Sequence, residues 1–225
     1  MAGRKLIQTK DGSSSVYDAY WNASFHSIHG AITESNQVYI ISGLQQLQFN
    51  GPSLQIFEFG FGTGLNAFLS LAYSQELSIP IEYTVIDSCI LEMDLVYQLD
   101  YPKQSNLRKY ADSFYRMHQV SWGKPSQIDT NFTLHKIQLD WNLFEPEFEQ
   151  HFDLIYFDAF GPEVQPELWN YDSLLKTHKI LKLGGLLCTY CAKGSVKRLL
   201  KQIGFKVESL NGPPGKREIT RAVKL

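Results

Sequence analysis

The stretch Ile56-Phe57-Glu58-Phe59-Gly60-Phe61-Gly62-Thr63-Gly64-Leu65-Asn66 decides how this chain folds. An apolar run breaks into three alternating glycines and then resumes at helical spacing, which predicts a strand, a tight turn and a helix. Glycines at such a turn permit a positive φ and let a ligand approach the backbone. The stretch therefore predicts a ligand site, and we expect the ligand to contain a nucleoside.

The spacing of these glycines argues against a dinucleotide. A dinucleotide-binding turn has the pattern G-x-G-x-x-G and places the phosphates at the helix N-terminus. Here Leu65 takes the place of the third glycine, and Gly64 comes one residue early. Glu58, just before the turn, is poorly suited to face a pyrophosphate. A nicotinamide enzyme is therefore disfavoured.

The rest of the chain alternates predicted strands and helices. Apolar runs predict strands at 54–59, 81–86, 133–139, 152–157, 186–191, 205–209 and 218–223. Helical spacing lies between them, including a helix over 88–96 that Ser88 can cap. This order predicts an α/β fold with a mostly parallel seven-stranded sheet and helices on both faces. The turn Asn-Gly-Pro-Pro-Gly at 211–215 predicts that the last two strands form a C-terminal β-hairpin.

Length and composition fit one domain. With 225 residues, of which 44% are hydrophobic, the chain can bury a full α/β core. We expect residues 1–50 to be an N-terminal segment that packs on a catalytic domain of residues 51–225, with an insertion or cap at 102–130. The basic N-terminus lacks an apolar signal region, and no stretch approaches the roughly 20 apolar residues of a membrane span. These features predict a cytoplasmic protein that binds no membrane.

The cysteines and histidines do not form a metal motif. Cys188 and Cys191 have C-x-x-C spacing but lie in a strand-like run without a second ligand pair. His26 and His29 likewise have no matching cluster nearby in the sequence. We interpret the two cysteines as buried structural thiols and predict no metal.

Carboxylates follow several predicted strands. Glu58, Asp87, Asp140 and Asp158 each end an apolar run. Open α/β sheets bind ligands at the carboxyl ends of their strands, so we expect these side chains to surround one crevice. Asp87 is placed to accept hydrogen bonds from ribose hydroxyls, and Asp140 from an adenine amino group. The alternative is that each residue caps the helix that follows it.

Charge is divided unevenly along the chain. Residues 1–175 hold 9 Lys and Arg against 21 Asp and Glu, whereas residues 176–225 hold 12 against 2. A basic surface of this kind can bind the phosphates of an RNA. The alternative is a set of solvated helix faces.

The glycine stretch and three further motifs resemble one enzyme family. Residues Glu58–Asn66 match the pattern E-x-G-F-G-T-G-L-N of the methyltransferase domain of the bacterial bifunctional tRNA wobble-uridine enzyme MnmC and its stand-alone relatives. The other matches are Ser27, Gly30, Glu34 and Ser35; residues 158–162 with Pro166 and Trp169; and residues 215–218. The resemblance extends from about Val16 to the end of the chain and implies a Rossmann-like class I methyltransferase fold.

The resemblance implies a specific reaction. It predicts transfer of a methyl group from S-adenosyl-L-methionine to the exocyclic amine of 5-aminomethyl-2-thiouridine at the tRNA wobble position. It also assigns roles to particular residues. Asp158 would be catalytic, as general base or orienting group. The cofactor would contact Glu58, Gly60, Gly62, Thr63, Gly64, Asn66, Asp87 and Asp140. Phe160 and Trp169 would stack on the base, although core packing is the alternative, and Lys216 and Arg217 would contact tRNA phosphates.

Two departures from the family pattern bear on these expectations. Ala159 and Gly161 replace the usual Gly and Ala or Ser of the active-site motif, which changes the predicted loop shape. The chain ends at Leu225, before the FAD-dependent oxidase domain of bifunctional relatives. We therefore expect methylation alone, with a separate FAD-dependent oxidase acting upstream. The rival interpretations are a methyltransferase or aminopropyltransferase for a small amine, and a non-catalytic RNA-binding module.

Overall fold

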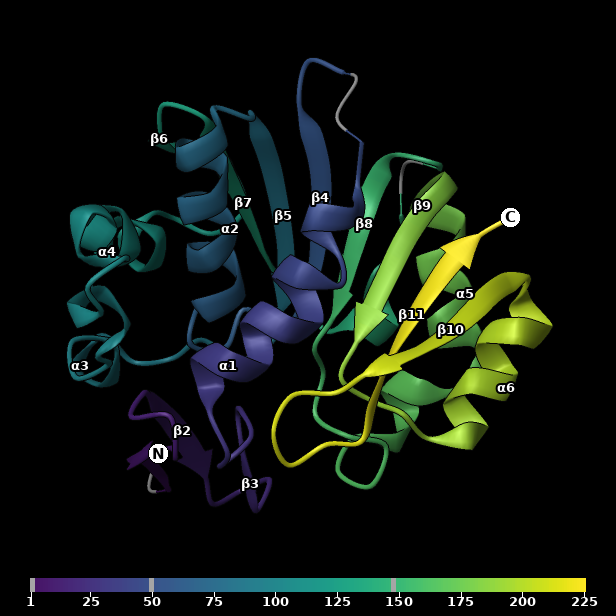
Figure 1. Cartoon of the computed structure of the whole chain (residues 1–225), viewed down its shortest axis with the longest axis horizontal. Coiled ribbons are helices and arrows are strands. Elements are labelled where there is room, and N and C mark those ends of the chain that lie inside the picture. Colours follow the sequence, from purple (N-terminus) through teal and green to yellow (C-terminus); the bar gives the residue numbers. More distant parts are fainter. Residues whose placement is uncertain (1–2, 49–50, 147–148) are drawn as a thin grey trace.

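The computed structural model describes residues 3–48, 51–146 and 149–225, and its main feature is an eight-stranded sheet (Figure 1). The strands of this sheet are β4 (Leu54–Phe59), β5 (Ile81–Asp87), β6 (Pro125–Asp129), β7 (Phe132–Gln138), β8 (Phe152–Phe157), β9 (Leu181–Thr189), β10 (Phe205–Asn211) and β11 (Glu218–Lys224). Their order is β10-β11-β9-β8-β4-β5-β7-β6. The four inner pairings β9-β8, β8-β4, β4-β5 and β5-β7 are parallel.

The sheet confirms the predicted fold class and adds one strand to it. The predicted hairpin is present, since β10 and β11 pair antiparallel along their whole length. The extra strand is β6, which pairs antiparallel with β7 at the edge of the sheet. Its sequence, Pro-Ser-Gln-Ile-Asp, has one large apolar residue and therefore no alternating pattern to predict a strand.

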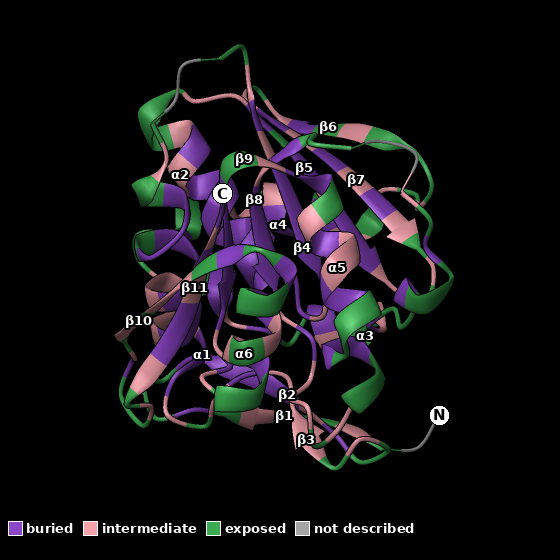
Figure 2. Cartoon of the chain, turned by 90° about the vertical axis from the view of Figure 1, so that its right-hand side faces the viewer, coloured by how far each residue is buried: buried purple, intermediate pink, exposed green. Residues whose placement is uncertain are grey.

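Helices cover both faces of the sheet because its central strands are apolar on both sides. In β4, Ile56 packs into the core cluster beneath α2 (Leu65–Leu77), whereas the next residue, Phe57, packs into the cluster beneath α5 (Tyr171–Ile180) and α6 (Gly194–Ile203). Successive strand residues point to opposite faces, so one apolar run fills both cores. Figure 2 shows the resulting buried strands at the centre of the molecule.

The segment after β5 differs from its prediction. The predicted helix over 88–96 is reduced to α3 (Met93–Val96), and Ser88 does not cap it. Instead, the Asp87 carboxylate accepts a hydrogen bond from the backbone N–H of Cys89 at 2.7 Å. This is an Asx-type turn, which holds the backbone out of the helical conformation for the residues that follow.

Residues 102–130, which were predicted to be an insertion or cap, lie between α3 and β7 and do not include a residue that lines the cavity described below. They contain the 3-10 turns η3 (Tyr101–Lys103) and η4 (Arg108–Tyr110), helix α4 (Ala111–Gln119) and strand β6. Phe114 of α4 packs on Phe68 of α2 with ring centroids 4.9 Å apart. The segment therefore extends the core beside α2 and widens the sheet.

The N-terminal segment forms structure of its own. Strands β1 (Arg4–Gln8), β2 (Ser14–Asp18) and β3 (Ala23–Ser24) make a small antiparallel sheet, followed by α1 (Ala31–Ser35), the π-helical stretch η1 (Asn36–Ile41) and η2 (Leu44–Gln46). The predicted domain boundary falls on residues 49–50, which lie outside the described residues. In Figure 1 the small sheet lies beside the carboxyl ends of the parallel strands. No helix in the described part of the chain is long and apolar enough to cross a membrane.

Candidate active site

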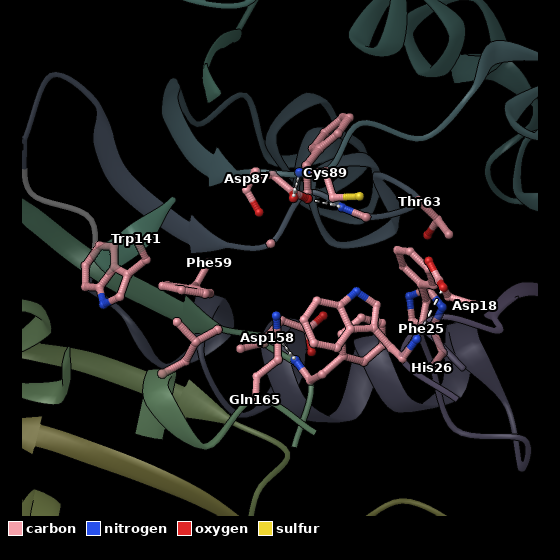
Figure 3. A pocket seen from close by; sticks show the side chains of 18 of the residues that line it. Asp18, Phe25, His26, Phe59, Thr63, Asp87, Cys89, Trp141, Asp158 and Gln165 are labelled. Atoms are coloured by element: carbon pink, nitrogen blue, oxygen red, sulfur yellow. Dashed lines mark hydrogen bonds between the residues drawn. The ribbon is translucent and has the colours of Figure 1, made fainter. Parts of the chain in front are cut away.

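A cavity of about 380 Å³ opens where β4 and β8 end side by side (Figure 3). The next strand after β4 is β5, on one side of the pair, whereas the next strand after β8 is β9, on the other side. Open α/β sheets bind ligands at the point where the strand order reverses in this way. One side of the cavity consists of strand ends, including Gly60, Asp87 and Asp158, and the other side consists of the N-terminal segment and the turn after β10. Segments from across the chain therefore meet at one place.

Residues 60–63 of the glycine turn form the floor of the cavity, whereas Gly64 is not among the lining residues and packs against His118 and Phe61. Gly60, Gly62 and Gly64 have φ values of 87°, 50° and 73°, a region that L-residues other than glycine rarely adopt. A Cβ added at Gly62 would lie 2.9 Å from the ring of Phe25, and one added at Gly60 would lie 3.2 Å from the carbonyl oxygen of Asp158. Side chains at these two positions would collide with Phe25 and crowd the backbone of Asp158, so the glycines let these segments pack closely against the turn. Thr63, in the same turn, is buried and lines the cavity.

Asp87 and Asp140 line the same cavity, as the sequence predicted for strand-end carboxylates. Asp87 accepts a hydrogen bond from the backbone N–H of Gly62 at 3.0 Å, so it also fixes the shape of the glycine turn. Burial raises the pKa of Asp87, whereas the N–H groups of Gly62 and Cys89 lower it. Asp140 is exposed and caps the short turn η5 (Trp141–Leu143) by accepting from the N–H of Asn142 at 2.8 Å. For Asp140 the capping alternative is therefore realised, at a position that still faces the cavity.

Asn66 joins two carboxylates at the centre of the site. Its side-chain amide donates to Oε1 of Glu58 at 2.9 Å and to Oδ2 of Asp158 at 2.8 Å. Tyr39, in the π-helical stretch η1, donates its hydroxyl to Oδ1 of Asp158 at 2.6 Å. Asp158 and Asn66 line the cavity. Glu58 does not line it and is buried, with 1% of its surface exposed. Glu58 therefore supports the site from behind the turn.

The two carboxyls are difficult to ionise. Burial raises the pKa of Asp158 to about 7, although the donors Tyr39 and Asn66 and the nearby Lys216 ammonium lower it. Burial also raises the pKa of Glu58 well above its usual range, and the negative charge of Asp158 adds to this effect. A group with a pKa near neutral pH can both accept and release a proton, which is what general acid–base chemistry requires.

Lys216 reaches into the cavity from the turn between β10 and β11. Its ammonium pairs with the carboxylate of Glu34 and lies 4.0 Å from the centroid of the Tyr190 ring. Glu34 also accepts the backbone N–H of Ser27 at 2.8 Å, and all four residues line the cavity. Lys216 was predicted to contact tRNA phosphates, but in this structure it is ion-paired inside the site. Arg217, the other predicted phosphate contact, is exposed.

The two predicted stacking aromatics have different positions. Phe160 lines the cavity and packs edge-on against Phe25 with ring centroids 5.4 Å apart. Trp169 is 4% exposed, packs against Phe157 in the core, and donates its indole N–H to the carbonyl of Phe160 at 2.7 Å. For Trp169 the core-packing alternative is therefore the one that the structure shows, because its ring is buried against Phe157. Trp21, which was not predicted as a site residue, also lines the cavity. Its ring centroid lies 6.0 Å from that of Phe160.

Much of the charge in the basic C-terminal fifth is compensated within the fold. Seven of its cations form ion pairs with carboxylates, namely Lys176, Lys182, Lys193, Lys197, Lys206, Lys216 and Arg221. Lys224 donates to two carbonyls of the α5–β9 connection. Exposed Arg198, Lys201 and Arg217 extend into solvent. The basic surface is therefore smaller than the sequence count implies.

The cysteines and histidines do not come together as a set of metal ligands in the described part of the chain. Cys188 and Cys191 are buried, as predicted, and Cys188 donates its thiol to the carbonyl of Ser42 at 3.6 Å. His26 is buried against Ser15, with 2.9 Å between its Nδ1 and the hydroxyl oxygen. Within the described ranges, no three His, Cys, Asp or Glu side chains are positioned to hold a metal ion.

The donor set fits a nucleoside cofactor. The cavity has a floor formed by a glycine turn and a carboxylate at the end of each of two adjacent strands, positions that suit the hydroxyl groups of a nucleoside. Its volume lies in the range of small-molecule sites. Glu34, Tyr39, Phe25 and Tyr190 complete the site and were not predicted individually. The one available signal was the N-terminal motif that contains Ser27 and Glu34.

Comparisons with known proteins agree with these observations. A family model described as S-adenosyl-L-methionine-dependent methyltransferase matches residues 104–225, which is more than half of the chain. The chain is 26% identical over 219 residues to a protein of Delftia acidovorans, covering 92% of this chain and 33% of that protein. It is 27% identical over 214 residues to a protein of Idiomarina loihiensis, covering 87% of this chain and 34% of that protein. Both are named tRNA 5-methylaminomethyl-2-thiouridine biosynthesis bifunctional protein MnmC. The chain thus spans about a third of the length of these curated relatives.

A solved structure supports the same grouping at the level of the fold. The crystal structure of MNMC2 from Aquifex aeolicus aligns with a TM-score of 0.78 at 21% identity, covering 99% of this chain and 70% of that one. The predicted Rossmann-like methyltransferase fold and the resemblance to the MnmC methyltransferase domain are therefore confirmed.

Proposed function

The chain belongs to the S-adenosyl-L-methionine-dependent methyltransferase family, and we propose that it methylates the aminomethyl group of 5-aminomethyl-2-thiouridine at the tRNA wobble position. The product would be 5-methylaminomethyl-2-thiouridine. The observation that supports this proposal most strongly is Asp158, a carboxyl with a pKa of about 7 that lines the cavity beside the glycine turn. The names of the curated relatives supply the acceptor.

Several residues would hold the cofactor, S-adenosyl-L-methionine. The backbone of Gly60–Gly64 would lie beneath it, and Asp87 and Asp140 would accept hydrogen bonds from its nucleoside. When bound, the cofactor supplies an electrophilic methyl group on a sulfonium. Phe25, Phe160 and Trp21, on the opposite side of the cavity, offer aromatic faces and edges on which an extruded base can stack.

Asp158 would prepare the acceptor nitrogen. An alkylamine is mostly protonated at neutral pH, like a lysine side chain, and has no lone pair for attack until it loses a proton. Tyr39 and Asn66 hold the two Asp158 oxygens in fixed positions, so the carboxylate can accept a hydrogen from the amine and orient its nitrogen. The Asp158 carboxylate, or water, would take up the proton that the nitrogen releases on methylation.

The exposed cations near the cavity would bind the tRNA backbone. Arg217 follows Lys216 in the turn that reaches the cavity, and Arg198 lies on the first half of α6. Contacts of this kind position a nucleic acid without reading its sequence and weaken as salt is added. The uridine itself would be selected inside the cavity.

The test is product identification. The purified protein is incubated with labelled S-adenosyl-L-methionine and tRNA that carries 5-aminomethyl-2-thiouridine, and the digested nucleosides are identified by mass spectrometry. The control is the same tRNA with 2-thiouridine at the wobble position, which lacks the amine. We expect 5-methylaminomethyl-2-thiouridine from the first tRNA and no labelled wobble nucleoside from the second. Cofactor binding without this product would contradict the proposed acceptor.

A further inference from the structure

The ion pair between Lys216 and Glu34 has the composition of an ammonium-binding site. Glu34 supplies a carboxylate that is 6% exposed, and Tyr190 supplies an aromatic face 4.0 Å from the bound nitrogen. A carboxylate together with the face of an aromatic ring is the usual way in which proteins bind an organic cation. Both groups line the cavity that Asp158 also lines, and the charges of Glu34 and Lys216 act on the pKa of Asp158.

Lys216 lies on an exposed turn, and its long side chain has several bonds that can rotate. Pro214, Gly215 and Arg217 around it are exposed, whereas the ammonium itself enters the cavity. The turn backbone packs directly against the N-terminal segment, because a Cβ at Gly215 would lie 2.2 Å from the ring of His29. The four-carbon stem of Lys216 can still swing to solvent by rotation of its own bonds, at the cost of the contacts described above.

We propose that the Glu34–Tyr190 face is a binding site for the primary ammonium group of a ligand, and that Lys216 occupies this site until the ligand displaces it. The inference rests on the proposed function, because both ligands of that reaction carry such a group. One is the aminomethyl group of the acceptor uridine, and the other is the α-ammonium of S-adenosyl-L-methionine.

The burial of Glu34 makes an exchange of cations necessary. If Lys216 leaves and no cation replaces it, a buried carboxylate keeps only the hydrogen bond from the backbone of Ser27. An unpaired buried charge is strongly unfavourable, so the site favours whichever ammonium is present. Lys216 therefore competes with the ligand, and its removal strengthens ligand binding. A lysine that binds tRNA phosphates would have the opposite effect, since its removal would weaken binding.

The test compares Glu34→Gln and Lys216→Met in equilibrium binding. S-adenosylhomocysteine, which keeps the α-ammonium and cannot react, is titrated by calorimetry. With it bound, the affinities for tRNA carrying 5-aminomethyl-2-thiouridine and for tRNA carrying 2-thiouridine are measured, and their ratio gives the contribution of the acceptor amine. Lys206→Met is the matched control, because Lys206 lies at the other end of β10 and does not line the cavity.

We expect Glu34→Gln and Lys216→Met to have opposite effects either on the affinity for S-adenosylhomocysteine or on the ratio of the two tRNA affinities. Glu34→Gln should weaken the ammonium contribution about tenfold, as expected for the loss of one charged hydrogen-bonding partner, and Lys216→Met should strengthen it about threefold or more. An opposite effect on the S-adenosylhomocysteine affinity identifies the cofactor ammonium as the ligand. An opposite effect on the tRNA ratio alone identifies the acceptor amine.

Other patterns overturn the proposal. Weaker binding in both variants would mean that the ion pair is only structural, and weaker tRNA binding in Lys216→Met alone would mean that Lys216 is a phosphate contact. No effect in either variant would also contradict it. If Glu34→Gln does not fold, Lys216→Met alone decides, since tighter binding is expected only from removal of a competitor. Methyl transfer by the unchanged protein is measured in parallel, so failure of the proposed function is recorded separately.

Discussion

The cavity has two walls that are built in different ways. The sheet wall consists of Gly60–Thr63, Asp87, Asp140 and Asp158, which all follow the ends of strands in one sheet. The appended wall consists of Trp21, Phe25, Glu34 and Lys216, which come from the N-terminal segment and the hairpin turn, and it meets the sheet wall at Tyr190, which follows β9. The ladders of the main sheet and glycine conformations fix the sheet wall, whereas the small β1–β3 sheet, ring contacts and ion pairs hold the appended wall. The comparison suggests that the first wall serves the cofactor and the second wall selects the acceptor.

The glycine floor offers the largest effect by which to test the sheet wall. Gly62→Ala should weaken S-adenosylhomocysteine binding about 100-fold, because the new Cβ would lie 2.9 Å from Phe25 at a φ of +50°. Calorimetry measures the loss. The matched control is Gly123→Ala, where φ is +84° but nothing lies within 4 Å of the new Cβ. If both variants lost affinity equally, backbone strain rather than occupation of the cavity would be the cause.

Asn66 tests whether the centre of the sheet wall depends on shared hydrogen bonds. Asn66→Ala removes the donor to both Glu58 and Asp158 and should lower the free energy of unfolding by about 2 kcal/mol at pH 8. Both carboxyls have raised pKa values in the folded protein, so the folded state loses stability as pH rises, for Asp158 between about 4 and 7. Without Asn66 these pKa values rise further. The penalty should therefore be smaller at pH 5, and an equal penalty in urea unfolding at both pH values would contradict the shared-donor account.

Arg4 tests how the appended wall is attached. Its guanidinium pairs with Asp18 at 2.9 Å and with Glu92 at 3.2 Å, and so connects β1 to β2 and to the segment after β5. Arg4→Met should lower the free energy of unfolding by about 1.5 kcal/mol and increase amide exchange in residues 4–28. Lys5→Met, on the exposed neighbouring residue, is the control. Unchanged exchange in the Arg4 variant would show that the wall does not depend on this pair.

Lys136 offers the smallest effect and should leave both walls intact. It is 1% exposed in β7, donates to the carbonyl of His118 at 3.0 Å, and burial lowers its pKa to about 8. The unfolded chain binds more protons between pH 8 and 10.5, so this lysine costs stability below pH 8 and the cost disappears as pH rises to 10.5. Lys136→Met should raise the free energy of unfolding by about 1 kcal/mol at pH 7 and by nothing near pH 10.5. A gain that does not depend on pH would contradict the charge-burial explanation.

The same division explains what the sequence could predict. The sheet wall was predictable because each of its residues directly follows an apolar run, and the glycine spacing has a local meaning. The extra strand β6 was not, since it has a single large apolar residue, and Trp169 was assigned to the site although the core uses its ring. The appended wall depends on contacts between residues far apart in the sequence, such as Lys216 with Glu34. Local patterns carry no signal for such pairs, and the motif containing Glu34 showed only that the position matters.

Asp158 belongs to the sheet wall and is held by Tyr39 of the N-terminal segment, and the proposed reaction depends on its carboxylate. The most direct test of this dependence is the single-turnover rate of methyl transfer to 5-aminomethyl-2-thiouridine tRNA by the unchanged protein and by Asp158→Asn, measured from pH 6 to 9. For the unchanged protein, the rate should rise with pH through about 7 as Asp158 ionises. The variant should be at least about 100-fold slower without that rise, with affinities for S-adenosylhomocysteine and tRNA within about twofold. A variant that transfers methyl groups at the original rate, or keeps the same pH dependence, would contradict the account.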